Sequence, residues 1–487
     1  MRWFKEYSIK YRSEIIIFVF ALALRLLSLV FILWREQQLG GFFREFGAYS
    51  FPLLPKDSSE YFELAKNLLN FGRFSLSSAP PLLPDSMRTP VYPAFLAAII
   101  FIFKSTLSIS MVQNVLGALS VVLFYKTARK FFSDKISKIS ALVFSVEPTV
   151  LYFSNVIASE QLFIFLFMLA LFVFLNKGAN GRRGVFLISG FILGLAILTR
   201  PLIQFLPLLF MAMIVYWGRC WGWRKIMASI SLFLLGIAIT VFPWSLRNKI
   251  TFDSWQISPV GAYNFYNYYV PMFLSQKYGL DLNSVMQDFK SRLAADRQSE
   301  VIVYRSLANA PYFMKMAGQE ILKDPASFSR FYLIKAVPFF ISDGLRDISR
   351  FLEYIGPPTT NLTDLFLRGN LSEMTKIIFR GNLEFNLFMA GFTFWLAVTF
   401  FMAVGALRWI VSKRTDKIYG LFIILLIFYF FIASGPIANG RFRLPVIPWM
   451  VALALYGIVL VGSWLKKYLP AWFKLIFRLD LKTGINL

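Results

Sequence analysis

Acidic and aromatic side chains at helical spacing are the first candidates for chemistry in this chain. Asp57 and Tyr61 lie four residues apart in the polar stretch from Lys56 to Pro93, so on a helix they share one face. An aspartate in such a position could take a proton as a general base. The spacing alone favours a simpler role for Asp57, because an aspartate at the start of a helix commonly caps it and is stabilised by the helix dipole.

Four further acids could belong to a site. Glu60 and Glu63 lie on the same predicted helix as Asp57, and we expect both to face solvent. Glu160 begins an apolar run, where it could cap a helix or serve a site, because ionisable groups at membrane depth are commonly functional. Glu147 lies inside another apolar run, and the sequence indicates no partner for it.

Five arginines form a second set, because each lies close to a proline that fixes the course of the backbone. They are Arg88, Arg200, Arg247, Arg441 and Arg443. A planar guanidinium group can bind two phosphate oxygens at once. For any single arginine, contact with lipid headgroups is the simpler interpretation. Several arginines at one face of a membrane would instead indicate a site for an anionic ligand that the membrane delivers.

The composition indicates which elements must position these residues. Hydrophobic residues make up 57% of the 487 residues, and charged residues make up 16%, below the roughly 25% typical of soluble proteins. The net charge of +25 would suit nucleic acid, but the basic residues fall between apolar runs, so an anionic membrane surface explains them better. The single cysteine, Cys220, excludes an internal disulfide framework, and the lack of histidine leaves oxygen ligands for any metal.

Apolar runs along the chain predict a polytopic membrane protein with about ten crossings. The first run is too long for a signal peptide and no cleavage site follows it, so we expect a signal anchor. A further run, Val91–Phe103, is too short to cross a hydrocarbon core of about 30 Å. The ten predicted spans are Ile15–Trp34, Met111–Tyr125, Ile139–Phe153, Ala158–Leu175, Val185–Leu198, Leu202–Trp217, Ile226–Phe242, Phe385–Leu407, Ile418–Ala433 and Val446–Val461.

Basic residues predict the orientation of these spans, because positively charged connections stay in the cytoplasm. If Val91–Phe103 does not cross, every strongly basic connection and both termini fall on one side. We therefore expect this run to lie in the outer interface, both termini to be cytoplasmic, and the five arginines to lie at the outer face. The predicted parts are an N-terminal transmembrane module over residues 1–243 with a first external loop over 35–110, an external domain with interfacial helices over 244–384, and C-terminal transmembrane helices with a basic tail over 385–487.

Short motifs follow one another in a distinctive order. They are Asp57-x-x-x-Tyr61-x-x-x-Ala65-x-x-Leu68-Leu69-x-x-Gly72-x-Phe74, Arg88-Thr89-Pro90-x-Tyr92-Pro93, Ser159-Glu160, Leu198-Thr199-Arg200-Pro201, Pro243-Trp244-x-x-Arg247-Asn248, and Arg441-Phe442-Arg443-Leu444-Pro445 with Pro448. This order resembles the GT-C superfamily of membrane glycosyltransferases, in particular bacterial relatives of protein O-mannosyltransferases and of the lipid A aminoarabinose transferase. The resemblance covers nearly the whole membrane part, whereas residues 249–384 carry little of it.

The resemblance implies a GT-C fold and a sugar delivered on a polyisoprenyl phosphate at the outer face of the membrane. A carboxylate of the first external loop then serves as general base, and Asp57 matches that position. It would activate a hydroxyl of a lipid, glycan or protein, and transfer would proceed with inversion. The implied substrate-binding residues are Tyr61, Arg88, Tyr92, Glu160, Arg200, Arg247, Arg441 and Arg443.

Ser58 limits this analogy, because some relatives have a second acid directly after the loop aspartate. We assign no metal ligand and no certain cofactor. Glu160 could orient the acceptor, or join Asp57 around a divalent cation such as magnesium or manganese, and both options stay open. The other expected partners are membrane lipids, not nucleic acid, and the expected location is the bacterial inner membrane.

Three other classes of protein remain open. A polymerase or ligase of lipid-linked glycans would share the topology, but its key residues usually lie in the large later loop. A transporter or flippase would require polar groups at mid-membrane, which are scarce here. A structural membrane protein would tolerate the loss of Asp57 and Arg443 together.

Overall fold

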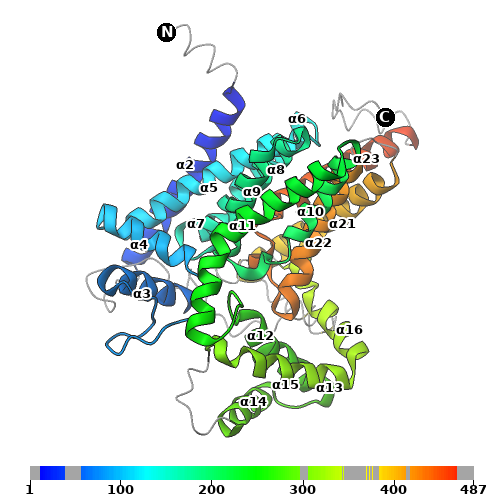
Figure 1. Ribbon diagram of the computed structural model, residues 1–487. Coiled ribbons are helices and arrows are strands. Elements are labelled where there is room, and N and C mark those ends of the chain that lie inside the picture. Colours follow the sequence, from blue (N-terminus) through cyan, green and yellow to red (C-terminus); the bar gives the residue numbers. More distant parts are fainter. Residues whose placement is uncertain are drawn as a thin grey trace.

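The computed structural model describes residues 11–38, 56–296, 305–342, 344, 369, 372, 376, 383–412 and 417–468 (Figure 1). Its regular structure is almost wholly helical. Of the predicted first loop, residues 39–55 lie outside the described part, and so do most residues between 343 and 382.

Six of the described helices are long and apolar enough to cross a membrane. Their outer surfaces are apolar as well, since side chains such as Val19, Leu27, Ile239 and Phe400 are each more than half exposed. Such surfaces belong in lipid rather than in water. The six helices are α2 (Arg12–Gln38), α5 (Leu107–Ala128), α11 (Trp223–Phe252), α21 (Leu383–Val411), α22 (Lys417–Ser434) and α23 (Ile447–Tyr468).

The predicted span Ile139–Phe153 is broken in the structure rather than continuous. Helices α6 (Asp134–Val146) and α7 (Pro148–Asn155) meet at a bend of 55°. Pro148 occupies the first position of α7, where its missing N–H costs nothing. The Glu147 carboxylate caps α7 by accepting a hydrogen bond of 2.7 Å from the backbone N–H of Val150. The bent pair together is apolar enough to count as a seventh span.

The remaining three predicted spans form shorter helices. All ten predicted spans are therefore helical, but not all are long enough to cross a membrane. These three are α8 (Glu160–Lys177), α9 (Arg183–Ile197) and α10 (Pro207–Trp217). With 15 and 11 residues, α9 and α10 rise only about 22 and 16 Å, which is less than a typical hydrocarbon core. Helix α4 (Val91–Phe103) has the predicted bounds, and the backbone N–H of Val91 donates to the Leu198 carbonyl at the end of α9.

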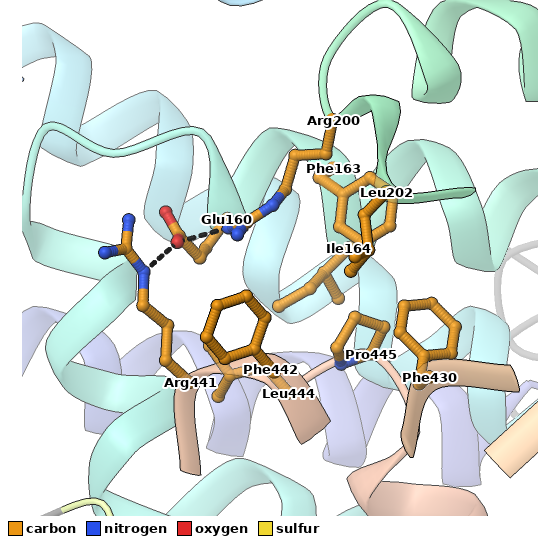
Figure 2. A pocket seen from close by; sticks show the side chains of 10 residues that line it. All are labelled: Glu160, Phe163, Ile164, Arg200, Leu202, Phe430, Arg441, Phe442, Leu444 and Pro445. Atoms are coloured by element: carbon orange, nitrogen blue, oxygen red, sulfur yellow. Dashed lines mark hydrogen bonds and ion pairs between the residues drawn. The ribbon is translucent and has the colours of Figure 1, made fainter. Parts of the chain in front are cut away.

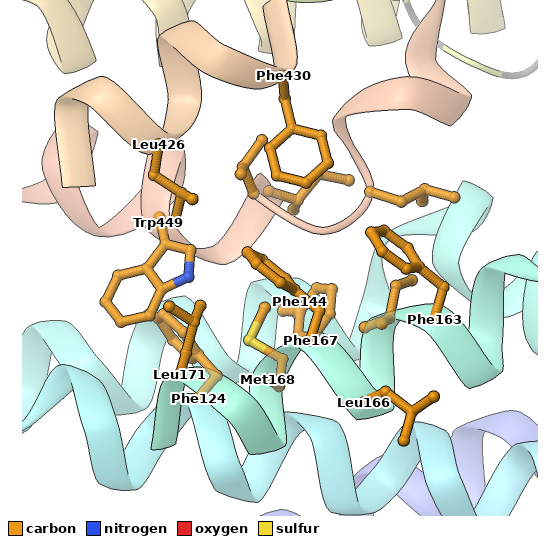
Figure 3. Packing of buried hydrophobic residues seen from close by; sticks show 14 of the residues in the cluster. Phe124, Phe144, Phe163, Leu166, Phe167, Met168, Leu171, Leu426, Phe430 and Trp449 are labelled. Carbon is orange, nitrogen blue, oxygen red and sulfur yellow. The ribbon is translucent and has the colours of Figure 1, made fainter. Parts of the chain in front are cut away.

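Close packing holds the bundle together. Glycines let α9 and α11 touch through their backbones, since a Cβ added to Gly190 would lie 2.1 Å from the Phe233 carbonyl oxygen. Such small-residue contacts are typical of helices that pack inside membranes. Aromatic rings fill the centre: Trp449 of α23 packs edge-on against Phe124 of α5 at a centroid distance of 4.9 Å, next to Phe144 of α6 (Figure 3).

Basic connections gather at one end of this bundle. Lys130, after α5, donates to the Asn176 carbonyl at the end of α8 at 2.9 Å. Phe131 stacks on Tyr419 at the start of α22, and Trp217 at the end of α10 donates to the same tyrosine hydroxyl at 3.0 Å. Four connections predicted to share a side of the membrane therefore lie together.

The opposite end carries α3 and a separate helical block (Figure 1). Residues 253–296 and 305–341, here called the α12–α17 block, pack around their own buried cluster of Tyr266, Phe273, Phe289 and Phe313. Their elements are α12 (Val260–Asn264), a π-helix (Phe265–Tyr269), α13 (Val270–Tyr278), α14 (Leu282–Asp296), α15 (Ala310–Lys323), α16 (Pro325–Ala336) and α17 (Pro338–Ile341). Asp324 caps α16, as its position before Pro325 predicts.

Candidate active site

Helix α3 (Lys56–Phe71) presents Asp57 in its first turn. Its other face is apolar, with Leu64 and Ala65 fully buried, so the helix packs on the bundle in one orientation. The Ser58 hydroxyl donates to the Ile157 carbonyl in the connection between α7 and α8, and this contact holds the start of α3 in place. Ser58 is thus a buried anchor, which fits a hydroxyl better than a second acid.

Two arginines from distant parts of the chain bind the Asp57 carboxylate. Arg88 donates from Nη2 to Oδ1 at 2.6 Å, and Arg441 donates from Nη2 to Oδ2 at 3.2 Å. Arg441 lies in the short helix Gly440–Arg443, which leads into α23. The Asp57 side chain is therefore an ion-pair partner of arginines and not simply a helix cap.

Glu160, the first residue of α8, is the second carboxylate of the site. It is 2% exposed and accepts hydrogen bonds from Arg200 and from the Nε of Arg441 (Figure 2). Figure 2 shows the two arginines approaching the carboxylate from opposite sides. Because Arg441 also reaches Asp57, one guanidinium group links the two acids.

Glu60 is the third carboxylate, and the prediction that it faces solvent is wrong. Arg88 donates from Nε to Glu60 at 2.7 Å, and Arg305 of the α12–α17 block donates to both of its oxygens. Glu60 lies three residues after Asp57, so the two acids share a helix face, and this spacing could have indicated the pair. Sequence reasoning also missed Arg305, which lies in the polar block without a motif of its own.

Charge is strongly concentrated here. Four guanidinium groups (Arg88, Arg200, Arg305 and Arg441) face three carboxylates, and the Asp85 carboxyl group lies near Arg88 and Arg305 as well, so basic and acidic groups are equal in number. Burial alone would raise the pKa of Asp57, but Arg88 and Arg441 outweigh it and lower the pKa to about 2. Burial likewise opposes ionisation of Glu60, and its two arginines still hold its pKa below the ordinary value.

A small pocket lies beside Glu160, with a cavity volume of about 10 Å³, which is room for about one water molecule. Arg200 and Arg441 form its polar wall, and the rest of its lining is mostly apolar. Charged and apolar side chains thus meet around this pocket, and a lipid-sized ligand would have to widen it. The apolar lining consists of Phe163, Ile164, Leu202, Phe430, Phe442, Leu444 and Pro445 (Figure 2).

The two predicted tyrosines support the charged cluster. Tyr61 donates to the Ser159 hydroxyl at 3.3 Å, and the Arg88 guanidinium lies over its ring at 4.9 Å. Tyr92 is fully buried, packs edge-on against Tyr61, and donates to Gln113 at 2.8 Å. Tyr61 therefore borders the carboxylates directly, whereas Tyr92 packs behind it.

The structure does not bring Arg247 and Arg443 to the carboxylates. Arg247 donates to the Asp85 carbonyl at 2.8 Å and lies over the Trp244 ring at 4.8 Å. Arg443 is fully buried, lies 3.6 Å from the Trp395 ring centroid and donates to the Phe339 carbonyl. Both arginines bind backbone carbonyls next to the site instead. The sequence could not indicate this, because neighbouring prolines do not reveal which way a side chain is buried.

The described residues contain no group of three or more His, Cys, Asp or Glu side chains arranged to hold a metal ion. Arg441 contacts both Asp57 and Glu160, so a divalent cation shared by these acids would have to displace its guanidinium group. The donor set therefore does not fit a bridging metal in this conformation.

Comparison with known proteins gives one family match and several structures of similar fold. Residues 87–244 match the family model described as dolichyl-phosphate-mannose-protein mannosyltransferase. No curated protein sequence matches the chain. The family match is confined to residues 87–244, and the chain as a whole has the GT-C fold of membrane glycosyltransferases.

Solved structures show where the fold recurs. The chain is similar to the Archaeoglobus fulgidus oligosaccharyltransferase AglB in complex with an inhibitory peptide and a dolichol-phosphate, at 14% identity, with 98% of this chain and 54% of that chain covered and a TM-score of 0.52. It is also similar to the A. fulgidus enzyme tethered to an acceptor peptide, at 15% identity, with 96% and 51% covered and a TM-score of 0.51. ArnT from Cupriavidus metallidurans bound to undecaprenyl phosphate matches at 13% identity over 84% of this chain and 74% of that chain, with a TM-score of 0.35. The chain spans about half the length of the archaeal enzymes.

Proposed function

We propose that this protein transfers a sugar from a polyisoprenyl phosphate donor to a hydroxyl group of a lipid, glycan or protein, with inversion at the anomeric carbon. One observation carries the proposal: Arg441 joins the Asp57 carboxylate to the wall of an amphiphilic pocket. Arg441, which could bind a phosphate group, thus contacts the Asp57 carboxylate, which could accept a proton.

The donor would bind with its phosphate at Arg200 and Arg441 and its isoprenyl chain along the apolar lining of the pocket. Arginine suits this task because its planar fork pairs with phosphate oxygens. Arg200 and Arg441 share the Glu160 carboxylate at the pocket wall, so their positive charge there would attract an anion. The archaeal enzyme of similar fold was solved with a dolichol-phosphate, which is a ligand of the same chemical class.

Asp57 would act as the general base. The acceptor oxygen attacks the anomeric carbon, the bond between that carbon and the phosphate oxygen breaks, and the acceptor proton moves to Asp57. Arg200 and Arg441 stabilise the charge that develops on the departing polyisoprenyl phosphate. An aspartate paired with two arginines is a weak base, so a phosphate that draws Arg441 to itself would also make Asp57 a better proton acceptor.

The basic end of the bundle would lie in the cytoplasm, and the end with α3 and the α12–α17 block would lie outside. This orientation follows the positive-inside rule, and in a bacterial inner membrane it would bring the site to the outer leaflet.

The first experiment is mass spectrometry of lipids, glycans and envelope proteins from a deletion strain, because a missing sugar identifies the acceptor. Wild-type protein should restore the sugar, and Asp57→Asn should fail to restore it while remaining folded in the membrane, with a loss of at least about a hundredfold in rate. Unchanged sugar content in the deletion strain, or an active Asp57→Asn protein, would contradict the proposal. A transporter would not depend on this single proton acceptor.

A further inference from the structure

The loop from Asp85 to Arg88 is hydrogen-bonded at successive residues to segments other than α3. The Ser86 hydroxyl accepts a hydrogen bond of 2.8 Å from the backbone N–H of Leu307, and the Met87 carbonyl accepts one of 2.9 Å from Ser258. Leu307 and Ser258 belong to the α12–α17 block, and Ser86 and Met87 are both buried. The block therefore forms hydrogen bonds with the two residues directly before Arg88.

The same block reaches α3 through a side chain. Arg305 binds the Glu60 carboxylate with both terminal nitrogens, and Glu60 is only 16% exposed. Glu60 also accepts from Arg88, whose other nitrogen binds Asp57. Because one Arg88 guanidinium links Glu60 to Asp57, a movement of Glu60 would carry Arg88 with it.

We infer that the α12–α17 block positions Arg88 on Asp57, and that Arg305 is the positioning residue that makes this connection through Glu60. This inference rests on the proposed function of Asp57 and gives the block a role that its lack of family motifs did not indicate. Arg305 contacts neither Asp57 nor the pocket wall, so it acts on Asp57 indirectly, through Glu60 and Arg88. Its guanidinium group also lies over the Tyr263 ring at 6.0 Å and near the Asp85 carboxylate.

The test compares three full-length variants in detergent or nanodiscs. Arg305→Met removes the connection, and Arg305→Lys keeps one donor for Glu60. Arg292→Met is the matched control, because Arg292 belongs to the same block but pairs with Asp288 and Glu320 inside it. Transfer is measured with undecaprenyl phosphate mannose as donor and a deletion-strain membrane extract as acceptor, and affinity is measured with undecaprenyl phosphate alone.

Arg305→Met should lower kcat roughly tenfold to a hundredfold, because misplacement of catalytic groups by about 1 Å costs that much. Affinity for undecaprenyl phosphate should change less than about twofold, since Arg200 and Arg441 keep their places. Arg305→Lys should recover part of kcat, and Arg292→Met should match wild type. An equal loss in Arg305→Met and Arg292→Met, or a parallel loss of undecaprenyl phosphate affinity, would overturn the inference.

Hydrogen exchange gives a second measurement that needs no substrate. Amides of residues 86–88 and of the first turn of α3 should exchange faster in Arg305→Met than in Arg292→Met. Equal exchange in both variants would overturn the positioning role even if no sugar were transferred. A wild-type protein that transfers no sugar from a panel of undecaprenyl phosphate sugars, with the expected exchange difference intact, would instead contradict the proposed function.

Discussion

At the scale of single residues, the site is a chain of ion pairs in which each of the three carboxylates binds two arginines. Arg441 joins Asp57 to Glu160, and Arg88 joins Asp57 to Glu60. Buried charges of this kind are stable only while their partners stay in place, because each ion lost from the set leaves another uncompensated. The arrangement makes the fold at this end sensitive to protonation of Asp57.

This sensitivity predicts a pH-dependent stability difference between wild type and Asp57→Asn. The pKa of Asp57 is about 2 in the folded protein and ordinarily 3.8, so its ion pairs stabilise the fold above about pH 4 and lose that effect as the pH falls toward 2. The difference in unfolding free energy should be about 2 kcal/mol at pH 7 and should fall to a few tenths of a kcal/mol near pH 2. Unfolding in detergent from pH 2 to 7 measures it.

Asp253→Asn provides the control for that experiment, because Asp253 pairs with Lys249 at an exposed position. Its unfolding should follow wild type across the whole pH range. A stability difference for Asp57→Asn that does not depend on pH would argue against the ion pairs as its source.

At the scale of helices, the sequence predicted what depends on local pattern and missed what depends on packing. All ten apolar runs are helical, and the bounds of α4 agree with the prediction, because apolar length and the neighbouring Pro90 are visible in the chain. The break at Glu147 was missed, although Pro148 signalled it. Arg443 could not be placed, because its burial depends on Trp395 and Phe339 from other helices.

The glycine contacts between α9 and α11 lead to a prediction at this scale. Gly236→Ala should destabilise the protein by about 1–3 kcal/mol, since the added Cβ would lie 2.2 Å from the Leu187 carbonyl oxygen. Gly184→Ala, at the start of α9, has open space around the added carbon and should be neutral or slightly stabilising. Thermal unfolding of both variants in one detergent compares them, and equal effects would contradict the close packing of the two helices.

At the scale of the whole molecule, the two ends of the bundle differ in chemistry. One end collects the basic connections, and the other collects the carboxylates, their arginines and the α12–α17 block. This separation could be predicted from charge patterning, because it depends on which connections are basic and not on side-chain geometry. The pairing of Glu60 with Arg305, 245 residues apart, could not.

Cysteine labelling tests the orientation of these two ends. Cys220, the single cysteine, is exposed at the basic end and should react with a membrane-impermeant maleimide only in inside-out vesicles. In a Cys220→Ser background, Leu280→Cys on the exposed surface of the α12–α17 block should react only in intact spheroplasts. Labelling of both positions from the same side would refute the proposed topology.

The short helices beside the pocket have a further consequence for the surrounding lipid. Arg200 and Leu202 lie between α9 and α10, which have only 15 and 11 residues. A bilayer adapts to a short apolar surface by becoming thinner next to it. We expect the bilayer to be locally thinner at this flank of the protein. The headgroups of nearby long-chain lipids would then lie at the depth of the pocket entrance before any lipid binds.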